Sequence, residues 1–493
     1  LKVGNEYTVK GVLMDKSTGE ELKVNDESIT AEETFIADAA DMTITLTCTL
    51  DAKTLAGNTT VVFETLYTEG KEVGRHHEID DEGQTVYIPE IHTTAKDQTT
   101  KINHTEANDK ATIVDTVYYS HLLPGKEYTV HGKLMDKKTG EPILIDGKEI
   151  TASTTFTAEK SEESVDVIFT FDASILAPKT VVAFEYMEYE GIEIAVHADI
   201  DDEDQTVYIP KIHTTAVGED TQDHIEKAKE EAVIVDTVSY EGLEIGREYT
   251  VAGKLMDKET GEPILVNGEE VTASETFTAE TEEGGIDITF TFDSSALAGK
   301  KIVAFEDVTY EGISIGTHED LTDEDQTISY PEIHTTAADQ ASGSKTMTLG
   351  SSVTLVDTVT YKGLTAGKTY VVKGTIMDKT SGQPIGVTAE TTFTAEAADG
   401  SVEVTFTFDT TKLQGKTLVV FETLYDTQGN PIVDHSDLND EDQTVSVPVQ
   451  LVIPPVVTGD DSSPMPYVFG LAVAVLIAMA AAVILLRKRK NQK

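Results

Sequence analysis

The chain contains 493 residues, with 37 Lys and Arg against 89 Asp and Glu, which gives a formal net charge of −52 at pH 7. Because this charge repels phosphate groups, it argues against a nucleic-acid partner. A single cysteine excludes an intramolecular disulfide and a thiolate metal cluster, whereas a hydrophobic content of 39% allows packed cores in several domains.

The chain begins with LKVGNEYTVK, which has neither an initiator Met nor the basic and apolar regions of a signal peptide. We therefore expect a fragment or a processed chain. Further along, Cys48 lies in the alternating run ITLTCTL. This pattern is typical of a strand with one buried face, so we expect Cys48 to be a buried structural thiol.

Apolar residues along the body recur with a period of two, which is the period of β-strands. In VEVTFTF, Val402, Val404, Phe406 and Phe408 share one face. The stretch EYTVHGKLMDKKTGEPI predicts two strands joined by a turn at Lys-Thr-Gly. The only helical pattern in the body, DHIEKAKEEA, is short and polar. The predicted fold class is therefore all-β, with tandem antiparallel β-sandwiches of the Ig-like or CnaB-like kind.

Long segments of the chain repeat with a period of 121 residues, since PEIHTTA begins at Pro89 and Pro331 and PKIHTTA begins at Pro210. A period this long indicates whole domains in a row rather than a solenoid of short units. The Pro-containing joints are short, so we expect a stiff array. The predicted units are 1–88, 89–209, 210–330 and 331–448.

Five polar residues recur in fixed order in each complete unit. They are a Thr in IHTTA, an Asp in VDTV, a Glu that ends VAFE or VVFE, and a His that lies eight residues before a Gln. In the first unit the positions of the Thr and the Asp fall before Leu1. This unit therefore has an orphan half-site, Glu64, His76 and Gln84.

The constellation is similar to that of the T-Q ester bond domain family. This resemblance implies attack of the Thr hydroxyl on the Gln carboxamide, a reaction to which these residue types are suited. A Thr hydroxyl is a weak nucleophile that needs a base, and His is suited to that role near neutral pH. A buried, protonated carboxyl can donate a hydrogen bond to the developing oxyanion. An adjacent Asp and Glu can share one proton, since two close carboxylates resist double ionisation. We interpret the acids around each Gln as solvated turn residues that position the last strand.

This constellation resembles the T-Q ester bond domain family of Gram-positive surface proteins, whose VAFE signature occurs at 182–185 and 303–306. Members join a Thr hydroxyl on the first strand to a Gln carboxamide on the last strand and release ammonia. The resemblance implies no cofactor. It implies the bonds Thr93–Gln205, Thr214–Gln326 and Thr335–Gln443. Because residues 1–88 contain only the half-site, we expect them to be uncrosslinked. The resemblance also implies three residues that assist each reaction. They are Asp115, Glu185 and His197 for the first bond, Asp236, Glu306 and His318 for the second, and Asp357, Glu422 and His435 for the third. The family pattern favours Thr93 because it lies two residues before an Ala, and Thr94 is the alternative.

Other interpretations of the same residues stay open. The Asp of VDTV can bond turn amides, and each His can be a surface residue. The run DIDDEDQ invites a calcium site, although a frame that starts at Asp199 offers Asp204 and Pro210 where an EF-hand needs Gly and Glu. A Lys–Asn isopeptide bond is the covalent rival, but no Lys and Asn recur together through the repeats.

The C-terminal segment predicts a membrane anchor. Residues 466–486 include a charge-free run from Tyr467 to Leu486, about the length that crosses the hydrocarbon core. The basic tail 487–493 should stay cytoplasmic. The linker 449–465 contains a Thr-Gly pair, so this region resembles a Gram-positive sorting signal that a sortase cuts between Thr458 and Gly459. Because Pro-Val-Val replaces the usual Leu-Pro-x before Thr-Gly, an ordinary single-span anchor is the alternative.

Together these features predict an extracellular, cell-wall-anchored stalk of an adhesin, stiffened by autocatalytic Thr–Gln crosslinks. Its expected partners are sortase and peptidoglycan at the C-terminus, and a host surface ligand reached through a region before Leu1. Each site consumes its own Gln, so we do not expect a turnover enzyme. The alternative function is that the repeats themselves bind a host ligand.

Overall fold

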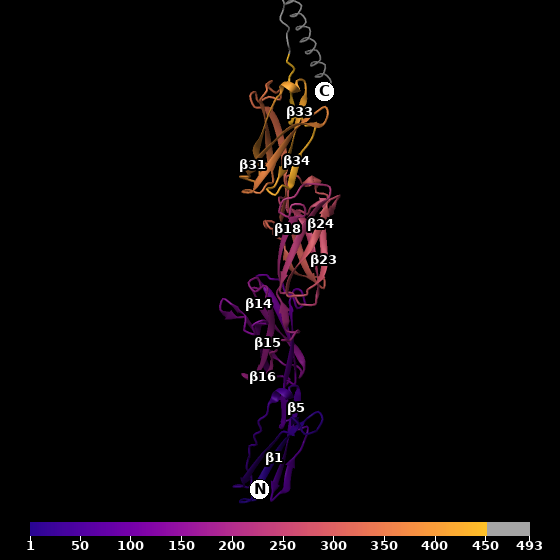
Figure 1. Cartoon of the computed structure of the whole chain (residues 1–493). Helices are drawn as coiled ribbons and strands as arrows, with labels where there is room; N and C mark the ends of the chain where they lie inside the picture. Colours follow the sequence, from indigo (N-terminus) through magenta and orange to yellow (C-terminus); the bar gives the residue numbers. More distant parts are fainter. Residues whose placement is uncertain (451–493) are drawn as a thin grey trace, which may run out of the picture.

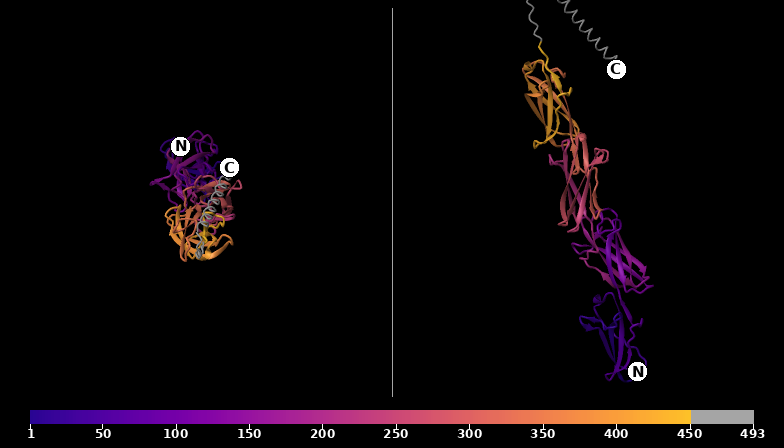
Figure 2. Two further views of the ribbon diagram at one scale, coloured as in Figure 1. Left: turned by 90° about the horizontal axis from the view of Figure 1, so that it is seen from above. Right: turned by 90° about the vertical axis from the view of Figure 1, so that its right-hand side faces the viewer.

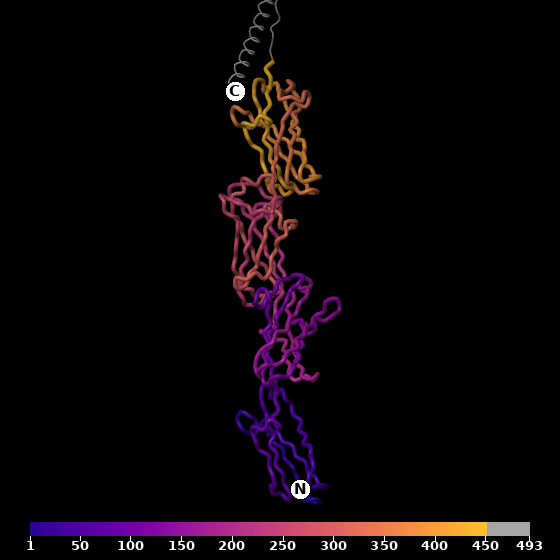
Figure 3. The backbone as a smooth tube through the Cα atoms, turned by 180° about the vertical axis from the view of Figure 1, so that it is seen from behind, coloured from indigo at the N-terminus to yellow at the C-terminus, as the bar shows by residue number. Residues whose placement is uncertain are grey.

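A computed structural model of the chain describes residues 1–450. Figures 1 and 2 show four β-rich bodies stacked end to end into a rod, with the N-terminus at one end. The tube in Figure 3 shows the colours following one another along the rod, so each body is built from one stretch of sequence. We name these bodies unit 1 (1–88) and domains 2 (89–209), 3 (210–330) and 4 (331–448).

Domain 2 is a sandwich of a three-stranded sheet and a five-stranded sheet. The small sheet contains β8 (Glu90–Asp97), β9 (Ala111–Ser120) and β14 (Glu163–Phe171). The large sheet contains β10 (Glu127–Asp136), β13 (Thr151–Thr157), β15 (Thr180–Tyr189), β16 (Ile192–His197) and β17 (Thr206–Tyr208). A small ribbon joins β11 (Leu144–Ile145) to β12 (Lys148–Glu149).

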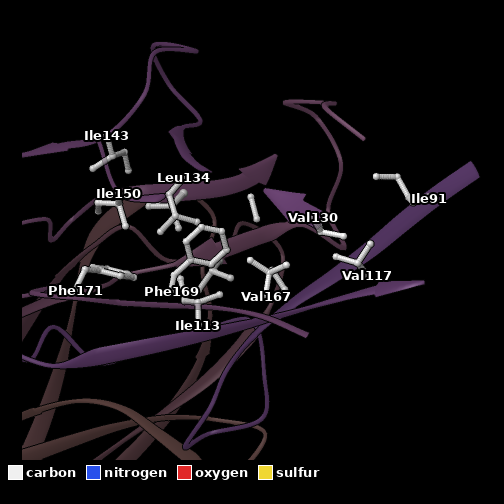
Figure 4. Packing of buried hydrophobic residues seen from close by; sticks show 14 of the residues in the cluster. Ile91, Ile113, Val117, Val130, Leu134, Ile143, Ile150, Val167, Phe169 and Phe171 are labelled. Carbon is white, nitrogen blue, oxygen red and sulfur yellow. The ribbon is translucent and has the colours of Figure 1, made fainter. Parts of the chain in front are cut away.

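The alternation of apolar residues explains how the two sheets of domain 2 pack. In β14, Val167, Phe169 and Phe171 are buried, and the residues between them are exposed. These side chains meet Leu134 and Val130 of β10 in a single core between the sheets (Figure 4). Removal of this apolar surface from water stabilises the sandwich, which confirms the all-β fold class predicted from the period of two.

Domains 3 and 4 repeat this architecture. The small sheet of domain 3 contains β18 (Lys211–Gly218), β19 (Ala232–Glu241) and β24 (Glu283–Phe292). Its large sheet contains β20 (Glu248–Asp257), β23 (Thr272–Thr278), β25 (Lys300–Tyr310), β26 (Ile313–His318) and β27 (Thr327–Tyr330). The domain also has a ribbon of β21 (Leu265–Val266) and β22 (Glu269–Glu270) and the 3₁₀ turn η2 (Ser295–Leu297). The small sheet of domain 4 contains β28 (Glu332–Asp339), β29 (Val353–Lys362) and β32 (Gly400–Phe408). Its large sheet contains β30 (Thr369–Asp378), β31 (Gln383–Thr394), β33 (Thr417–Tyr425), β34 (Pro431–His435) and β35 (Thr444–Ser446), and the domain also has the 3₁₀ turn η3 (Thr411–Leu413). The segment DHIEKAKEEA, which has a short helical pattern, forms no helix.

Unit 1 has only the large sheet. It contains β1 (Glu6–Asp15), β4 (Thr30–Ile36), β5 (Asn58–Thr68), β6 (Lys71–His76) and β7 (Thr85–Ile88), with a ribbon of β2 (Lys23–Val24) and β3 (Glu27–Ser28) and the 3₁₀ turn η1 (Ala52–Leu55). The prediction of a buried Cys48 is wrong, because this residue is exposed and residues 42–50 form no strand. The corresponding strand β14 pairs with β9, and the counterpart of β9 is not among the described residues.

The loop after the first strand of domain 2 reaches into domain 3. His104 is fully buried, with its ring 5.1 Å from that of Tyr208 and 4.7 Å from that of Tyr310. Its Nε2 lies 3.1 Å from the hydroxyl of Tyr249, and Ile102 packs against the core of domain 3. The joint between these domains is therefore a packed contact rather than a free linker.

The next joint uses the same loop with different residues. Ile225 lies one period after His104 and is part of the domain 4 core. Beside it, Asp223 forms an ion pair with Lys368 at 2.6 Å. Both joints thus hold adjacent domains together through side chains of the loop that follows the first strand.

Within residues 1–450, no helix combines the length and the apolar composition that a membrane span requires. The predicted span 466–486, the basic tail 487–493, Thr458 and Gly459 all lie outside the described residues, as does most of the linker 449–465.

Candidate functional site

The small sheet of domain 2 carries two of the predicted site residues on its inner face. Thr93 lies opposite Val117 in the pairing of β8 with β9, and Ala95 lies opposite Asp115. Because residues two apart share a face of a strand, Thr93 and Asp115 both point into the sandwich, where both are buried. The neighbouring Thr94 is only partly buried.

The large sheet supplies the other three residues. Glu185 of β15 lies opposite His197 of β16, and Gln205 directly precedes β17, which also pairs with β15. The residue opposite Glu185 on β10 is Gly132. A Cβ atom there would lie 2.6 Å from Cζ of Phe169, so the glycine makes room for a core ring beside the carboxyl.

The side chains of the two sheets meet in the interior of domain 2. Gln205 Nε2 donates hydrogen bonds to Thr93 Oγ1 at 2.5 Å and to Glu185 Oε2 at 2.6 Å. The Thr93 hydroxyl lies 3.3 Å from the same Glu185 oxygen. The carboxamide oxygen of Gln205 has no hydrogen-bond partner among the described residues. The hydroxyl, the carboxamide and the carboxyl therefore form one compact buried cluster.

Domains 3 and 4 contain the same cluster. In domain 3, Gln326 Nε2 contacts Thr214 Oγ1 and lies 2.5 Å from Glu306 Oε2. In domain 4, Gln443 Nε2 lies 2.6 Å from both Thr335 Oγ1 and Glu422 Oε2. The Thr, Asp, Glu and Gln side chains of all three clusters are between 0% and 3% exposed. All the Thr, Asp, Glu and Gln residues predicted for these sites thus converge on one interior point in each domain.

Burial and mutual repulsion perturb the two carboxyls of each cluster. Burial first, and then the neighbouring Asp, raise the pKa of Glu306 to about 10 and that of Glu422 to about 11, and the pKa of Glu185 rises well above its ordinary value for the same reasons. Burial also raises the pKa of Asp115, while a hydrogen bond with Glu185 lowers it. The raised pKa favours the protonated form of the Glu in each pair at neutral pH.

Each His lies at the edge of the cluster and is held by an Asp. In domain 4, His435 Nδ1 lies 3.5 Å from Thr335 Oγ1, and Nε2 lies 3.0 Å from Asp440 Oδ2. A carboxylate that accepts the Nε2 hydrogen leaves Nδ1 free to accept a proton from the threonine hydroxyl. In domain 2, His197 Nδ1 is buried without a hydrogen-bond partner among residues 1–450.

The aspartates that hold the histidines were not predicted, because we had interpreted the acidic turns as solvated. The His–Asp contacts are 3.1 Å for His197–Asp202, 2.8 Å for His318–Asp323, 3.0 Å for His435–Asp440 and 2.8 Å for His76–Asp81. The spacing of five residues from His to Asp is constant in all four units, and this regularity was the signal that could have identified them.

Unit 1 contains the half-site that the large sheet supplies. Gln84 Nε2 contacts Glu64 Oε2, and His76 contacts Asp81. The side chain of His76 is 46% exposed, against 17% for His318, because unit 1 has no small sheet over it. The Gln–Glu and His–Asp contacts thus form within the large sheet alone.

One group of metal-type ligands occurs within the part of the chain that the structure describes. Ligand atoms of His76, Glu78 and Asp81 lie within 4.8 Å of one another. His76 and Glu78 are exposed, and the same His also makes the His–Asp contact of the half-site. The group therefore coincides with the acidic turn of unit 1 rather than forming a separate buried centre.

A model of the T-Q ester bond containing domain matches residues 1–88, 89–209, 210–330 and 331–447. Among solved structures, a bacterial adhesin from Mobiluncus mulieris with intramolecular disulfide, isopeptide and ester bond crosslinks is similar in two crystal forms. The first is 13% identical with a TM-score of 0.24, and the second is 14% identical with a TM-score of 0.23; each comparison covers 51% of this chain and 88% of the adhesin. A β-D-mannosidase from Dictyoglomus thermophilum is 9% identical with a TM-score of 0.18, and that comparison covers 42% of this chain and 28% of the mannosidase. No curated protein matches the sequence.

Proposed function

The chain belongs to the T-Q ester bond containing domain family, and from this premise we propose that domains 2, 3 and 4 each form an ester between their buried Thr and Gln. The observation that carries the proposal is the cluster in which one Gln nitrogen contacts both the Thr hydroxyl and the Glu carboxyl, repeated in three domains. The bonds would join Thr93 to Gln205, Thr214 to Gln326 and Thr335 to Gln443.

The reaction exchanges one bond at the carboxamide carbon. Thr Oγ1 attacks Gln Cδ, the Oγ1–H and Cδ–Nε2 bonds break, and an Oγ1–Cδ bond forms. The Thr proton leaves with the nitrogen as ammonia, so the reaction needs neither an oxidant nor a co-substrate. Holding the two groups in contact can account for about 7–11 kcal/mol of the barrier.

The neighbouring groups carry the protons. The Nδ1 atom of the His takes the proton of the Thr hydroxyl, and the Asp on Nε2 stabilises the imidazolium that results. The Glu–Asp pair gives a proton to the departing nitrogen. The imidazolium then returns its proton to the pair, and ammonia is the only product released.

The contacts of the Glu favour a role other than the one expected from sequence. We expected a protonated carboxyl to stabilise the oxyanion, but in all three domains Glu Oε2 faces the nitrogen of the Gln and not its oxygen. A protonated carboxyl in that place is suited to general-acid catalysis at the leaving group. We therefore assign Glu185, Glu306 and Glu422 to protonation of the nitrogen.

Such bonds suit a load-bearing stalk. Each ester would connect the small sheet to the large sheet, near the first and last strands of the domain, so a pulling force would cross the domain without separating the sheets. The packed joints at His104 and Ile225 extend this stiffness from one domain to the next. Because every site consumes its own Gln, the chain is a self-crosslinking structural protein rather than a turnover enzyme.

We also propose that this stalk is part of an adhesin on a Gram-positive surface. The support is the sequence of residues 451–493, in which Thr458–Gly459, an apolar span and a basic tail follow one another. Sortase and peptidoglycan would be the partners at this end, and a host ligand would be bound by a region before Leu1. Incubation of the chain with sortases of different classes tests the anchor, with cleavage expected after Thr458. An uncleaved chain would indicate an ordinary membrane anchor.

Peptide mapping tests the crosslink itself. Proteolysis of the purified chain should release a branched peptide in which the Thr93 segment is covalently joined to the Gln205 segment. Fragmentation should place the branch at Thr93 and not at Thr94. Recovery of both segments only as separate, unmodified peptides would refute the proposal.

A further inference from the structure

A lysine reaches the Gln-bearing turn in every unit of the chain. Its ammonium group donates a hydrogen bond to the hydroxyl of the Thr that directly follows the Gln. The distances are 3.0 Å for Lys137–Thr206, 2.7 Å for Lys258–Thr327, 3.1 Å for Lys379–Thr444 and 3.0 Å for Lys16–Thr85. In each case the lysine is the first residue after a long strand of the large sheet.

The same Thr hydroxyl also donates a hydrogen bond to the backbone of the turn. Thr327 Oγ1 donates to the backbone oxygen of Asp323 at 2.5 Å, and the side chain of Asp323 holds His318 at 2.8 Å. An ammonium group can only donate, so Lys258 fixes the Thr hydroxyl with its proton toward Asp323. Lysine, threonine, aspartate and histidine thus form one chain of hydrogen bonds around Gln326.

The hydrogen bond between the lysine and the threonine is largely buried, and its donor is charged. Thr206 is fully buried and Thr327 is 3% exposed, and the side chain of Lys258 is only 20% exposed. Hydrogen bonds from a charged donor are roughly twice as strong as neutral ones. The contact therefore limits the movement of the turn that ends in the Gln.

We propose that Lys137, Lys258 and Lys379 are positioning residues for ester formation. Each holds the turn so that the Gln carboxamide and the His–Asp pair face the Thr of the other sheet. The inference rests on the proposed ester chemistry. In unit 1 the Lys16–Thr85 contact is present without the small sheet, so the large sheet sets the turn independently of the Thr that attacks.

A second lysine in each domain provides a matched control. Lys300 forms an ion pair with Asp257 at 2.9 Å, and Asp257 directly precedes Lys258. Lys300 is therefore a lysine at the same end of the large sheet, but it makes no contact with Thr327. Loss of either lysine removes one charge. Loss of Lys300 removes its contact with Asp257, whereas loss of Lys258 removes its contacts with Thr327 and Glu324, both of which lie on the Gln-bearing turn.

The test follows bond formation in the full chain during cell-free synthesis. Aliquots are quenched in denaturant, digested, and analysed by mass for the crosslinked peptides of each domain. In Lys258→Met, the domain 3 ester should form about 10–100-fold more slowly, while domains 2 and 4 keep their wild-type rates. Lys258→Arg should restore much of the rate, Thr327→Val should slow domain 3 as Lys258→Met does, and Lys300→Met should have no effect.

Three results separate the possible failures. A wild-type rate in both Lys258→Met and Thr327→Val would overturn the positioning role, and so would an equal slowing in Lys300→Met, which would indicate general destabilisation. If Lys258→Met does not fold, Thr327→Val and the rescue by Lys258→Arg still decide the question. Absence of crosslinked peptides in the wild-type chain would instead refute the ester proposal itself.

Discussion

Thr93 and Gln205 are separated by 112 residues, yet Gln205 Nε2 lies 2.5 Å from Thr93 Oγ1 between the two sheets of domain 2. Thr93 belongs to the small sheet, and Gln205 directly precedes β17 of the large sheet. A bond between them would close nearly the whole domain into one loop. The following predictions concern the stability, the chemistry and the joints that this relationship implies.

Replacement of Gln326 by Ala should remove the crosslink of domain 3 alone. A crosslink that closes a loop of about 100 residues contributes about 4–5 kcal/mol in the chain-entropy model, so the free energy of unfolding of domain 3 should fall by about that amount. Hydrogen exchange resolved by domain measures the change. The matched control is Gln84→Ala in unit 1, because no Thr partner of Gln84 is among residues 1–450. A loss of similar size there would show that the Gln acts only through its hydrogen bonds.

Replacement of Glu306 by Gln should stop the domain 3 reaction almost completely. The amide keeps the size of the protonated carboxyl but cannot give a proton to the leaving nitrogen, and loss of a general acid costs about 10²–10⁴-fold in rate. The time course of crosslinked peptide measures the effect. Asp287→Asn, at an exposed acid hydrogen-bonded to Thr237, is the control and should react normally. An unchanged rate in Glu306→Gln would exclude the assigned role.

The protonated carboxyl of domain 4 predicts a dependence of stability on pH. In Gln443→Ala, which cannot form the ester, Glu422 remains buried beside Asp357. Because the pKa of Glu422 is raised from 4.5 to about 11 in the fold, the folded state binds more protons than the unfolded state between these values. The contribution to stability is complete below pH 4.5 and falls as the pH rises toward 11, by at most about 1.4 kcal/mol per pH unit.

Thermal unfolding of Gln443→Ala from acid to alkaline pH checks this dependence. The additional change Glu422→Gln should flatten the curve, since the amide does not titrate. A stability that increases with pH over this range, or an equal slope with and without Glu422, would contradict the account of the buried pair.

The joint between domains 2 and 3 should loosen in acid. Burial, and then the positive charge of Arg247, lower the pKa of His104 from 6.5 to about 4. The neutral imidazole therefore stabilises the joint above pH 6.5, and this contribution is lost as the pH falls through 4. It amounts to at most about 3 kcal/mol. At the next joint, Ile225 occupies the position equivalent to His104.

Spin-label distances across the joint measure this loosening. With Cys48 replaced by Ser, one introduced Cys in each of domains 2 and 3 gives a narrow distance distribution at neutral pH, which should broaden near pH 4. His104→Phe keeps the aromatic packing without a titrating group and should remain narrow. A wild-type distribution that stays narrow in acid would contradict the role of His104.

The fold and much of the site follow from local sequence patterns, but the acidic turn does not. Alternation in VEVTFTF determines which residues of β32 are buried, and the recurring Thr, Asp, Glu, His and Gln identify the groups that converge. Asp323 could not be separated from its acidic neighbours, because only the folded turn shows which carboxylate faces His318. Lys258 was missed because it lies 69 residues from Thr327.

The incorrect prediction for Cys48 has a related cause. Alternation predicts a strand only where another strand offers backbone hydrogen bonds and an apolar face. In domain 2, β9 offers β14 the backbone hydrogen bonds and the large sheet offers it the apolar face. The run around Cys48 has no such partner strand among residues 1–450. Local pattern therefore identifies a segment that can form a strand, and the presence of its neighbour decides whether it does.

The most direct test of the crosslinks is the intact mass of the full-length chain under denaturing conditions. Three esters predict a mass lower than that of the unmodified sequence by three molecules of ammonia, and Gln205→Ala should leave a deficit of two. A wild-type chain with the mass of its unmodified sequence would contradict the account.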